Sequence, residues 1–306
     1  MPQKRRVAVL VFPRRQEGLP FLDSLIAGLR EAGWVDGRNI VVELSYAESA
    51  DDLPRAAAAL VGSKPDVIVT TATPTAAAVK RATATIPVVM AVAADPIGGG
   101  VVASLARPGG NVTGLTLATP DIAAKRLELL REAVPGASHV AAVHSTPYAS
   151  VRSVLTQWIR ESEAAAKVLG LRLTVLDIGN DPNGWDRLLG AAARDGVNAI
   201  TVVETSEIYT NRKTIAELTL KHRLPGIFPW RQAPEAGCLM SYGANVAAMF
   251  RRAAAFVDKI LRGAKPADLP IEAPREFELV INGKTAKALA LTIRPSLLLR
   301  ATQVIE

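Results

Sequence analysis

Threonines surround a predicted strand-to-helix junction in the segment TTATPT, residues 70–75. Thr73 is expected to cap the helix and Pro74 to lie in its first turn. Backbone N–H groups and the hydroxyls of Thr73 and Thr75 would then face a ligand. A helix N-terminus of this kind attracts an anion such as a carboxylate. The alternative is a capping motif with no ligand.

The most glycine-rich stretch, DPIGGGVVASLARPGGNVTGLT (95–116), contains no phosphate-binding motif. It matches neither GxGxxG nor GxxxxGK[ST], and it has no lysine. Asp95 is expected to cap a helix over 98–107 or to contact a ligand. Gly109 and Gly110 permit the positive φ that an abrupt turn requires. We therefore interpret the stretch as a strand-end loop, a helix and a turn, and not as a nucleotide site.

Polar and aromatic residues follow the predicted strands of the second half of the chain. Glu204 could pair with an amine, and Tyr209 could line the same site. Trp230 and Tyr242 follow the last two of these strands, where an aromatic ring offers a stacking face at little conformational cost. The alternatives are a capped helix start and a hydrophobic lid over the sheet edge.

The residues available for catalysis are few. His139 and His144 flank one predicted strand, and His222 lies in a helical run. No GxSxG elbow, HExxH motif or paired His/Asp spacing accompanies them. The single cysteine, Cys238, excludes an intramolecular disulfide and a cysteine-rich metal site. We expect neither an enzyme nor a bound metal or cofactor.

Composition narrows the class of protein. The chain has 306 residues and a formal net charge of +7. Its basic residues are scattered, KRR at 4–6 being the one tight cluster, so a nucleic-acid partner is not expected. No apolar run reaches the roughly 18 residues of a membrane helix. VAVLVF at 7–12 is too short for a signal peptide, so we expect a cytosolic protein or the mature form of an exported one.

Apolar runs alternate with amphipathic segments throughout the chain, which predicts an α/β fold with two doubly wound parallel sheets in tandem. Strands are predicted at 7–12, 39–46, 66–71, 86–93, 111–116, 139–144, 171–178, 198–204, 225–230, 238–242 and 277–281. Helices are predicted at 21–33, 53–62, 74–84, 98–107, 120–134, 148–169, 184–195, 208–223, 244–262 and 284–290. Because ligands bind at the carboxyl ends of parallel strands, two such sheets could direct their strand-end loops to one cleft.

Several longer motifs resemble a known family. They are RPGGNVTGLT, AAKRLELLREAVP (123–135), EAGCLMSYG (235–243), KILRGAKPADLPIEAPREFELVINGKTAKAL (259–289) and PSLLLRATQVIE. Together they resemble the ABC transporter substrate-binding proteins, and within them the branch that binds tryptophan, phenylalanine or tyrosine. The resemblance extends over nearly the whole chain from about Leu22.

The resemblance implies a periplasmic-binding fold of the first type, in which two lobes joined by three crossovers close over a small ligand. Lobe one would comprise residues 1–117 and 243–275, and lobe two residues 118–242 and 276–306. It also implies a monomer in the periplasm, or anchored to the membrane outside the cytoplasm, that delivers its ligand to a permease and an ATPase.

The resemblance also places ligand contacts in the strand-end loops. With the residues discussed above, the candidate ligand-binding set is Arg14, Thr73, Pro74, Thr75, Asp95, Ser145, Thr146, Tyr148, Glu204, Ser206, Tyr209, Trp230 and Tyr242. The candidate crossover or hinge set is Asn111, Thr113, Gly114, Ser241 and Gly243.

Two departures from the family leave the ligand class open. Residues 204–207 read Glu-Thr-Ser-Glu where relatives often have an aspartate that could hold an amino group. The loop PRRQEGLP (13–20) is unusual, and Arg14 or Arg15 could bind a carboxylate through two parallel hydrogen bonds. The ligand is therefore an aromatic amino acid, or an aromatic or other organic acid without an amine. Two other functions stay open: a sensor module of a regulator or receptor, and an α/β enzyme.

Overall fold

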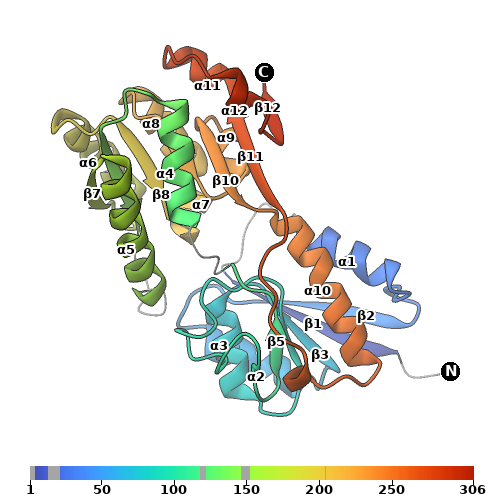
Figure 1. Cartoon of the computed structure of the whole chain (residues 1–306). Coiled ribbons are helices and arrows are strands. Elements are labelled where there is room, and N and C mark those ends of the chain that lie inside the picture. The colour runs from blue at the N-terminus through green and yellow to red at the C-terminus, as the bar shows by residue number, and fades with distance from the viewer. Residues whose placement is uncertain (1–3, 13–20, 118–121, 146–151, 204) are drawn as a thin grey trace. The chain divides into compact units, whose positions relative to one another are not determined.

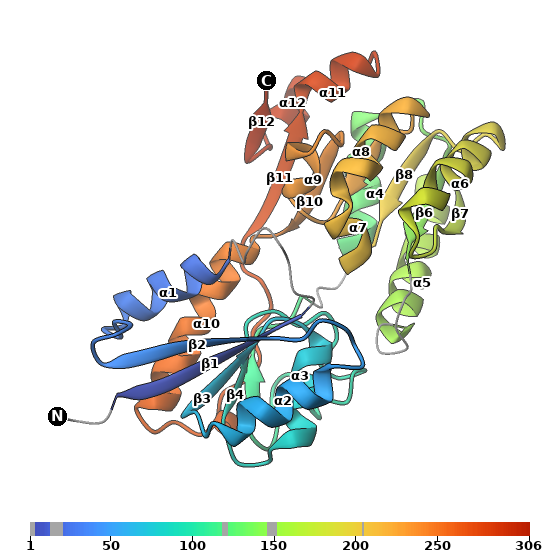
Figure 2. The same cartoon turned by 180° about the vertical axis from the view of Figure 1, so that it is seen from behind.

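A computed structural model describes residues 4–12, 21–117, 122–145, 152–203 and 205–306. The chain forms two compact units, shown in Figures 1 and 2. Unit 1 comprises Met1–Thr119 and Asn245–Glu276, and unit 2 comprises Pro120–Ala244 and Phe277–Glu306. The chain therefore crosses three times from one unit to the other. The predicted α/β class with two parallel sheets is confirmed, except that two edge-side strands of the second sheet run antiparallel to the others.

Unit 1 contains a five-stranded parallel sheet in the order β2-β1-β3-β4-β5. Its strands are β1 (Arg5–Val11), β2 (Ile40–Tyr46), β3 (Val67–Thr70), β4 (Val88–Met90) and β5 (Val112–Gly114). Its helices are α1 (Leu22–Glu31), α2 (Leu53–Gly62), α3 (Thr73–Ala82), α10 (Val246–Leu261) and the 3-10 helix η2 (Pro266–Asp268). Figures 1 and 2 show α1 and α10 on one face of the sheet and α2 and α3 on the other. Because both faces are covered, the inner strands β3 and β4 are fully buried, and β1 is a continuous apolar run from Val7 to Val11.

Unit 2 contains a seven-stranded sheet in the order β12-β11-β10-β9-β8-β6-β7. Its strands are β6 (His139–His144), β7 (Arg172–Asp177), β8 (Ala199–Val202), β9 (Gly226–Phe228), β10 (Met240–Ala244), β11 (Phe277–Asn282) and β12 (Gln303–Ile305). Strand β11 runs antiparallel to β10, with Ala244 opposite Phe277. The prediction of an all-parallel second sheet is wrong at β11, and β12, which pairs parallel to β11, runs in the same reversed direction. The chain leaves unit 2 at the end of β10 and returns beside it, so the returning strand must run the other way.

Helices cover both faces of the second sheet. They are α4 (Ile122–Ala133), α5 (Arg152–Leu169), α6 (Pro182–Arg194), α7 (Ser206–Thr210), α8 (Arg212–Lys221), α9 (Gln232–Glu235), α11 (Gly283–Ala288) and α12 (Pro295–Leu298). The two views show α4 and α5 on one face and α6 and α8 on the other. The predicted helix over 208–223 is two helices, because the backbone at Asn211 (φ −98°, ψ 29°) ends one and starts the next.

The predicted helix over 98–107 does not form; the segment consists of turns and bends. Consecutive glycines at 98–100 lose more backbone entropy in a helix than any other residue type, and Gly100 has φ +67°. The N–H groups of Val101 and Val102 both donate to the carbonyl of Pro96. Asp95 therefore caps a turn, accepting from the N–H of Gly98 at 2.7 Å.

Cys238 lies in the core of unit 2 with no exposed surface. Burial raises the pKa of its thiol far above the ordinary value, and the thiolate is the reactive form. We expect Ellman's reagent to leave the native protein unmodified and to release one equivalent of chromophore after unfolding. Rapid release from the native protein would contradict this placement.

Candidate functional site

The loop after β3 leads into α3, and its capping differs from the prediction. The N-cap is Ala72, with extended backbone (φ −164°, ψ 162°), and Thr73 is the first helical residue. The hydroxyl of Thr75 accepts from the N–H of Ala72 at 3.0 Å and donates to its carbonyl at 2.7 Å. Thr75 is fully buried and its hydroxyl is bonded to Ala72, so this hydroxyl is not free, contrary to expectation; its contact with a ligand stays a prediction. Pro74 occupies the second helical position, where its missing N–H costs nothing.

Thr73 and Asp95 come together from the ends of β3 and β4. The N–H of Asp95 donates to the hydroxyl of Thr73 at 3.3 Å. Gly99 packs against the same threonine, because a Cβ at Gly99 would lie 2.5 Å from Thr73 Cγ2. A hydroxyl that accepts one hydrogen bond can still donate its own proton. At the carboxyl edge of its sheet, unit 1 thus has the hydroxyl of the buried Thr73 next to the half-buried Asp95.

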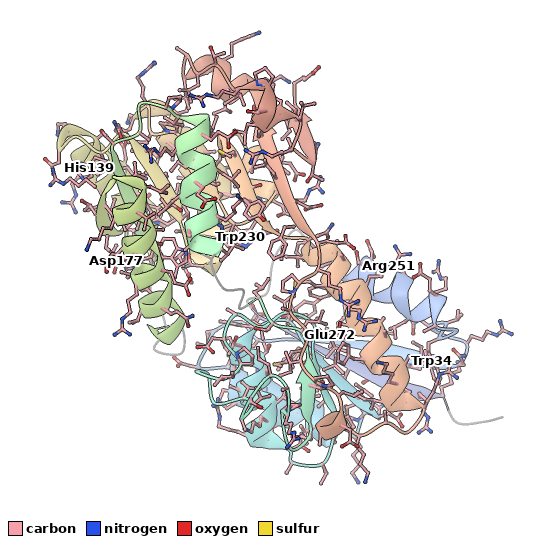
Figure 3. All side chains as sticks on the ribbon, viewed as in Figure 1. Trp34, His139, Asp177, Trp230, Arg251 and Glu272 are labelled. Carbon is pink, nitrogen blue, oxygen red and sulfur yellow. The ribbon has the colours of Figure 1, made fainter. Side chains whose placement is uncertain are left out.

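Two aromatic residues meet at the carboxyl edge of the second sheet. Tyr209 in α7 and Trp230 after β9 form an edge-to-face pair, with ring centroids 5.1 Å apart and planes at 89°. The guanidinium of Arg212 lies 5.2 Å from the centroid of the Tyr209 ring. Tyr209 is buried, whereas Trp230 keeps part of its surface exposed. Trp230, labelled in Figure 3, is therefore the ring of this pair that a ligand could stack on.

Glu207 in the first turn of α7 was not among the predicted site residues. Its carboxylate is half-buried, and burial raises the pKa of this carboxyl above the ordinary value. Within the described part of the chain, no basic side chain forms an ion pair with it. A desolvated carboxylate two residues from Tyr209 would be stabilised by a cation from a ligand. The sequence signal was the second acid of Glu-Thr-Ser-Glu, but its burial depends on the tertiary fold.

Ser145 follows β6 at the same edge, and its hydroxyl is already bonded within unit 2. It is fully buried and donates to Asn180 Oδ1 at 2.7 Å. The neighbouring His144 is buried with Nδ1 3.8 Å from Asp177 Oδ1. Burial lowers the pKa of His144, and the carboxylate of Asp177 partly opposes this. These residues stabilise the ends of β6 and β7.

Tyr242, predicted as a ligand contact, is engaged inside unit 2. Its ring stacks on Phe277 at 5.8 Å, and its carbonyl accepts from Arg126 Nε at 2.8 Å. Of the crossover candidates beside it, Ser241 is buried in β10. Gly243 lies so close to Pro229 that an added Cβ would be 1.9 Å from the proline carbonyl oxygen.

The other three crossover candidates are bonded within unit 1. The side-chain amide of Asn111 donates to the carbonyls of Thr83 (3.1 Å) and Ile86 (2.8 Å). Thr113 is fully buried and donates to the carbonyl of Leu269 at 2.7 Å. Gly114 ends β5 beside β4. The chain leaves unit 1 five residues later, after Thr119.

Four predicted ligand contacts, Arg14, Thr146, Tyr148 and Glu204, lie outside the described residues. The backbone of Ser206 begins α7. Among the residues that the structure describes, no group of three or more His, Cys, Asp or Glu side chains could hold a metal ion. In the same part of the chain, no helix has the length and apolarity needed to cross a bilayer.

Comparison with known families agrees with this architecture, in which the chain passes three times between two α/β units. The model of the family described as ABC transporter substrate binding protein matches residues 6–305. The chain belongs to this family. The predicted resemblance is confirmed. Such proteins bind a small-molecule ligand outside the cytoplasm and work with an ABC transporter, so this substrate-binding protein is a solute binder and not an enzyme.

This substrate-binding protein is similar to proteins with known structures or ligands. The "Tyrosine-binding protein" of Clostridioides difficile (strain R20291) is 26% identical over 279 residues, covering 88% of this chain and 77% of that protein. A conserved domain protein from Vibrio cholerae has a TM-score of 0.87 and 27% identity, covering 99% of this chain and 100% of its own. The ABC domain from Streptococcus pneumoniae in complex with L-Trp has a TM-score of 0.86 and 26% identity, with the same coverage.

Proposed function

We propose that this protein is the extracytoplasmic solute-binding component of an ABC importer for an aromatic amino acid, which it captures by hinge closure. The observation that favours this ligand class is the Tyr209–Trp230 ring pair at one sheet edge of unit 2, with the half-buried Glu207 in the same short helix as Tyr209. Support also comes from two relatives, one named a tyrosine-binding protein and one solved with L-Trp.

Each part of an aromatic amino acid has a chemically matched group in this proposal. The aromatic side chain stacks on the exposed part of Trp230. The ammonium group pairs with the carboxylate of Glu207, which otherwise has a high desolvation cost. The carboxylate accepts from the hydroxyl of Thr73 at the start of α3, where the helix dipole favours negative charge. An organic acid without an amine would leave Glu207 uncompensated.

Glu207→Gln is expected to stabilise the ligand-free protein at neutral pH and to weaken its binding of an aromatic amino acid. Below the ordinary glutamate pKa of about 4.3 the carboxyl is protonated in folded and unfolded chains alike. As the pH rises, the unfolded chain ionises first, so the folded state loses stability up to the raised folded pKa. The advantage of glutamine should therefore appear above that pKa and vanish in acid, as measured by thermal unfolding across pH.

The control for this prediction is Glu217→Gln, which neutralises an exposed glutamate on α8. It should leave the affinity for ligand unchanged. Equal unfolding profiles for wild type and Glu207→Gln, with equal affinities, would remove Glu207 from the proposed site.

A thermal-shift screen tests the proposed ligand class. The panel comprises amino acids, aromatic acids without an amine, short organic acids and sugars. A ligand at about 100 times its dissociation constant adds roughly 2.7 kcal/mol of stability. The proposal predicts shifts with aromatic amino acids and weaker ones with their amine-free analogues. A response confined to amine-free acids or to sugars would overturn it.

A further inference from the structure

The three chain crossings are flanked by segments that we call connectors. Connector 1 leads from β5 to α4, connector 2 from β10 to α10, and connector 3 from residue 271 to β11. On the unit 1 side, connector 3 is bonded to connector 1 through Glu272. Its N–H donates to the carbonyl of Gly114 and its carbonyl accepts from the N–H of Thr116, both at 3.0 Å.

The side chain of Glu272 is bonded to the helix that follows connector 2. Arg252 in α10 donates from Nε to Oε2 at 2.9 Å and from Nη2 to Oε1 at 2.6 Å, the paired geometry that guanidinium and carboxylate favour. The hydrogen bond from Arg252 lowers the pKa of the Glu272 carboxyl. In addition, the N–H of Asn245 donates to the carbonyl of Glu276 at 3.0 Å. All three connectors are therefore joined within unit 1.

In unit 2 an arginine likewise bonds elements that flank the crossings. Arg126 lies in α4, which follows connector 1, and is only 1% exposed. Its Nε donates to the carbonyl of Tyr242 in β10. The ring of Tyr242 in turn stacks on Phe277, the first residue of β11. The helix after connector 1, the strand before connector 2 and the strand after connector 3 thus meet at Tyr242, whose carbonyl accepts from Arg126 and whose ring packs on Phe277.

We propose that Arg252 and Arg126 are positioning residues. Arg252 in unit 1 and Arg126 in unit 2 each hold together the segments that flank the three crossings. Among the residues that the structure describes, bending between the units is then confined to two short stretches, Ala244–Asn245 and Glu276–Phe277. The three connectors move together, as one hinge. Neither arginine needs to contact the ligand for this role. Only the expected effect on ligand affinity rests on the proposed hinge closure.

The contacts of the two arginines lower the conformational entropy of the open, ligand-free state. Connectors that flexed independently would let the units sample more orientations, and ligand binding would have to remove that freedom. Removing the ion pair of one of these arginines, such as Arg252–Glu272, should therefore raise the dissociation constant of the ligand without any change in ligand contacts. Changes at positions that couple through a network alter affinity by about 0.5–2 kcal/mol, which is roughly 2- to 30-fold.

The test uses Glu272→Gln, which keeps the backbone bonds of connector 3 and removes the charge that Arg252 holds. The matched control is Arg251→Gln. Arg251 is the adjacent residue of α10, but its ion-pair partner is Glu31 of α1 and not a connector. Figure 3 shows Arg251 on the side of α10 next to α1 and Glu272 on the side nearer β5.

Two readouts separate a hinge role from a purely structural one. Spin labels at Ala58→Cys in α2 and Glu217→Cys in α8 report the distance distribution between the units in the ligand-free protein; both sites are exposed. Calorimetry with L-tyrosine and L-tryptophan reports affinity. Glu272→Gln should broaden the distribution and raise the dissociation constant roughly 2- to 30-fold. Arg251→Gln should do neither.

An unchanged distance distribution in Glu272→Gln would overturn the proposal, even if the variant unfolded at a lower temperature. So would a broadening of equal size in Arg251→Gln. Failure of the proposed function is a separate result: wild type would bind neither amino acid, while the spin-label comparison, which needs no ligand, would still decide the role of the connectors.

Discussion

Trp230→Ala is expected to weaken the binding of an aromatic amino acid by about 1–3 kcal/mol, or roughly 5- to 150-fold in dissociation constant. The substitution removes the stacking face at the end of β9 and also the partner of the Tyr209 ring. The loss should fall mainly on the dissociation rate, as is usual when a contact of an existing interface is removed. Isothermal titration calorimetry with L-tryptophan measures the effect.

Two further variants show whether the lost affinity comes from the ring itself. Trp230→Phe keeps an aromatic face and should retain most of the affinity. Trp34→Phe changes a tryptophan of unit 1 whose indole N–H donates to Asp258 at 2.8 Å, and it should leave affinity unchanged. If Trp230→Ala binds as tightly as wild type, Trp230 does not contact the ligand.

Gly114→Ala is expected to destabilise the protein by about 3 kcal/mol or more. Gly114 has φ +128°, a conformation that residues with a side chain rarely adopt. An added Cβ would also lie 2.2 Å from the carbonyl oxygen of Met90 on the neighbouring strand β4. Neither group can move, since both belong to the backbone of the same sheet. Thermal or urea unfolding measures the loss.

The matched control is Gly110→Ala. Gly110 also has positive φ (+78°), but no atom lies within 4 Å of an added Cβ. It should cost only the strain of the left-handed backbone, about 1–2 kcal/mol. If the two variants lost the same free energy of unfolding, the close approach of β5 to β4 would not contribute to the cost of Gly114→Ala.

Much of the fold could be predicted because local sequence determined it. HVAAVH was predicted as a strand over 139–144, and β6 has these bounds. Helix α1 was predicted from apolar spacing and ends near Gly33, whose φ of +90° terminates it. The prediction of a helix over 98–107 is wrong, because the three glycines that begin the segment disfavour a helix. The direction of β11 could not be predicted, since it depends on where the chain re-enters unit 2.

The candidate site was less predictable, because its properties depend on tertiary contacts. Thr75 and Ser145 have the right residue types at the right strand ends, but their hydroxyls are bonded to Ala72 and Asn180. Glu207 was missed because an acid in an acidic turn is typical of a solvated helix start. Its desolvation arises only when α7 packs on the sheet. Contacts of Trp230 and Thr73 with a ligand remain predictions.

The most direct test of the central claim is calorimetric titration of the protein with L-tyrosine and L-tryptophan, after unfolding and refolding to remove any ligand bound during expression. We predict saturable binding of at least one of them at one molecule per chain, with a micromolar or lower dissociation constant. Their amine-free analogues should bind much more weakly. Absence of saturable binding for both amino acids, in protein that has refolded completely, would contradict the proposed function.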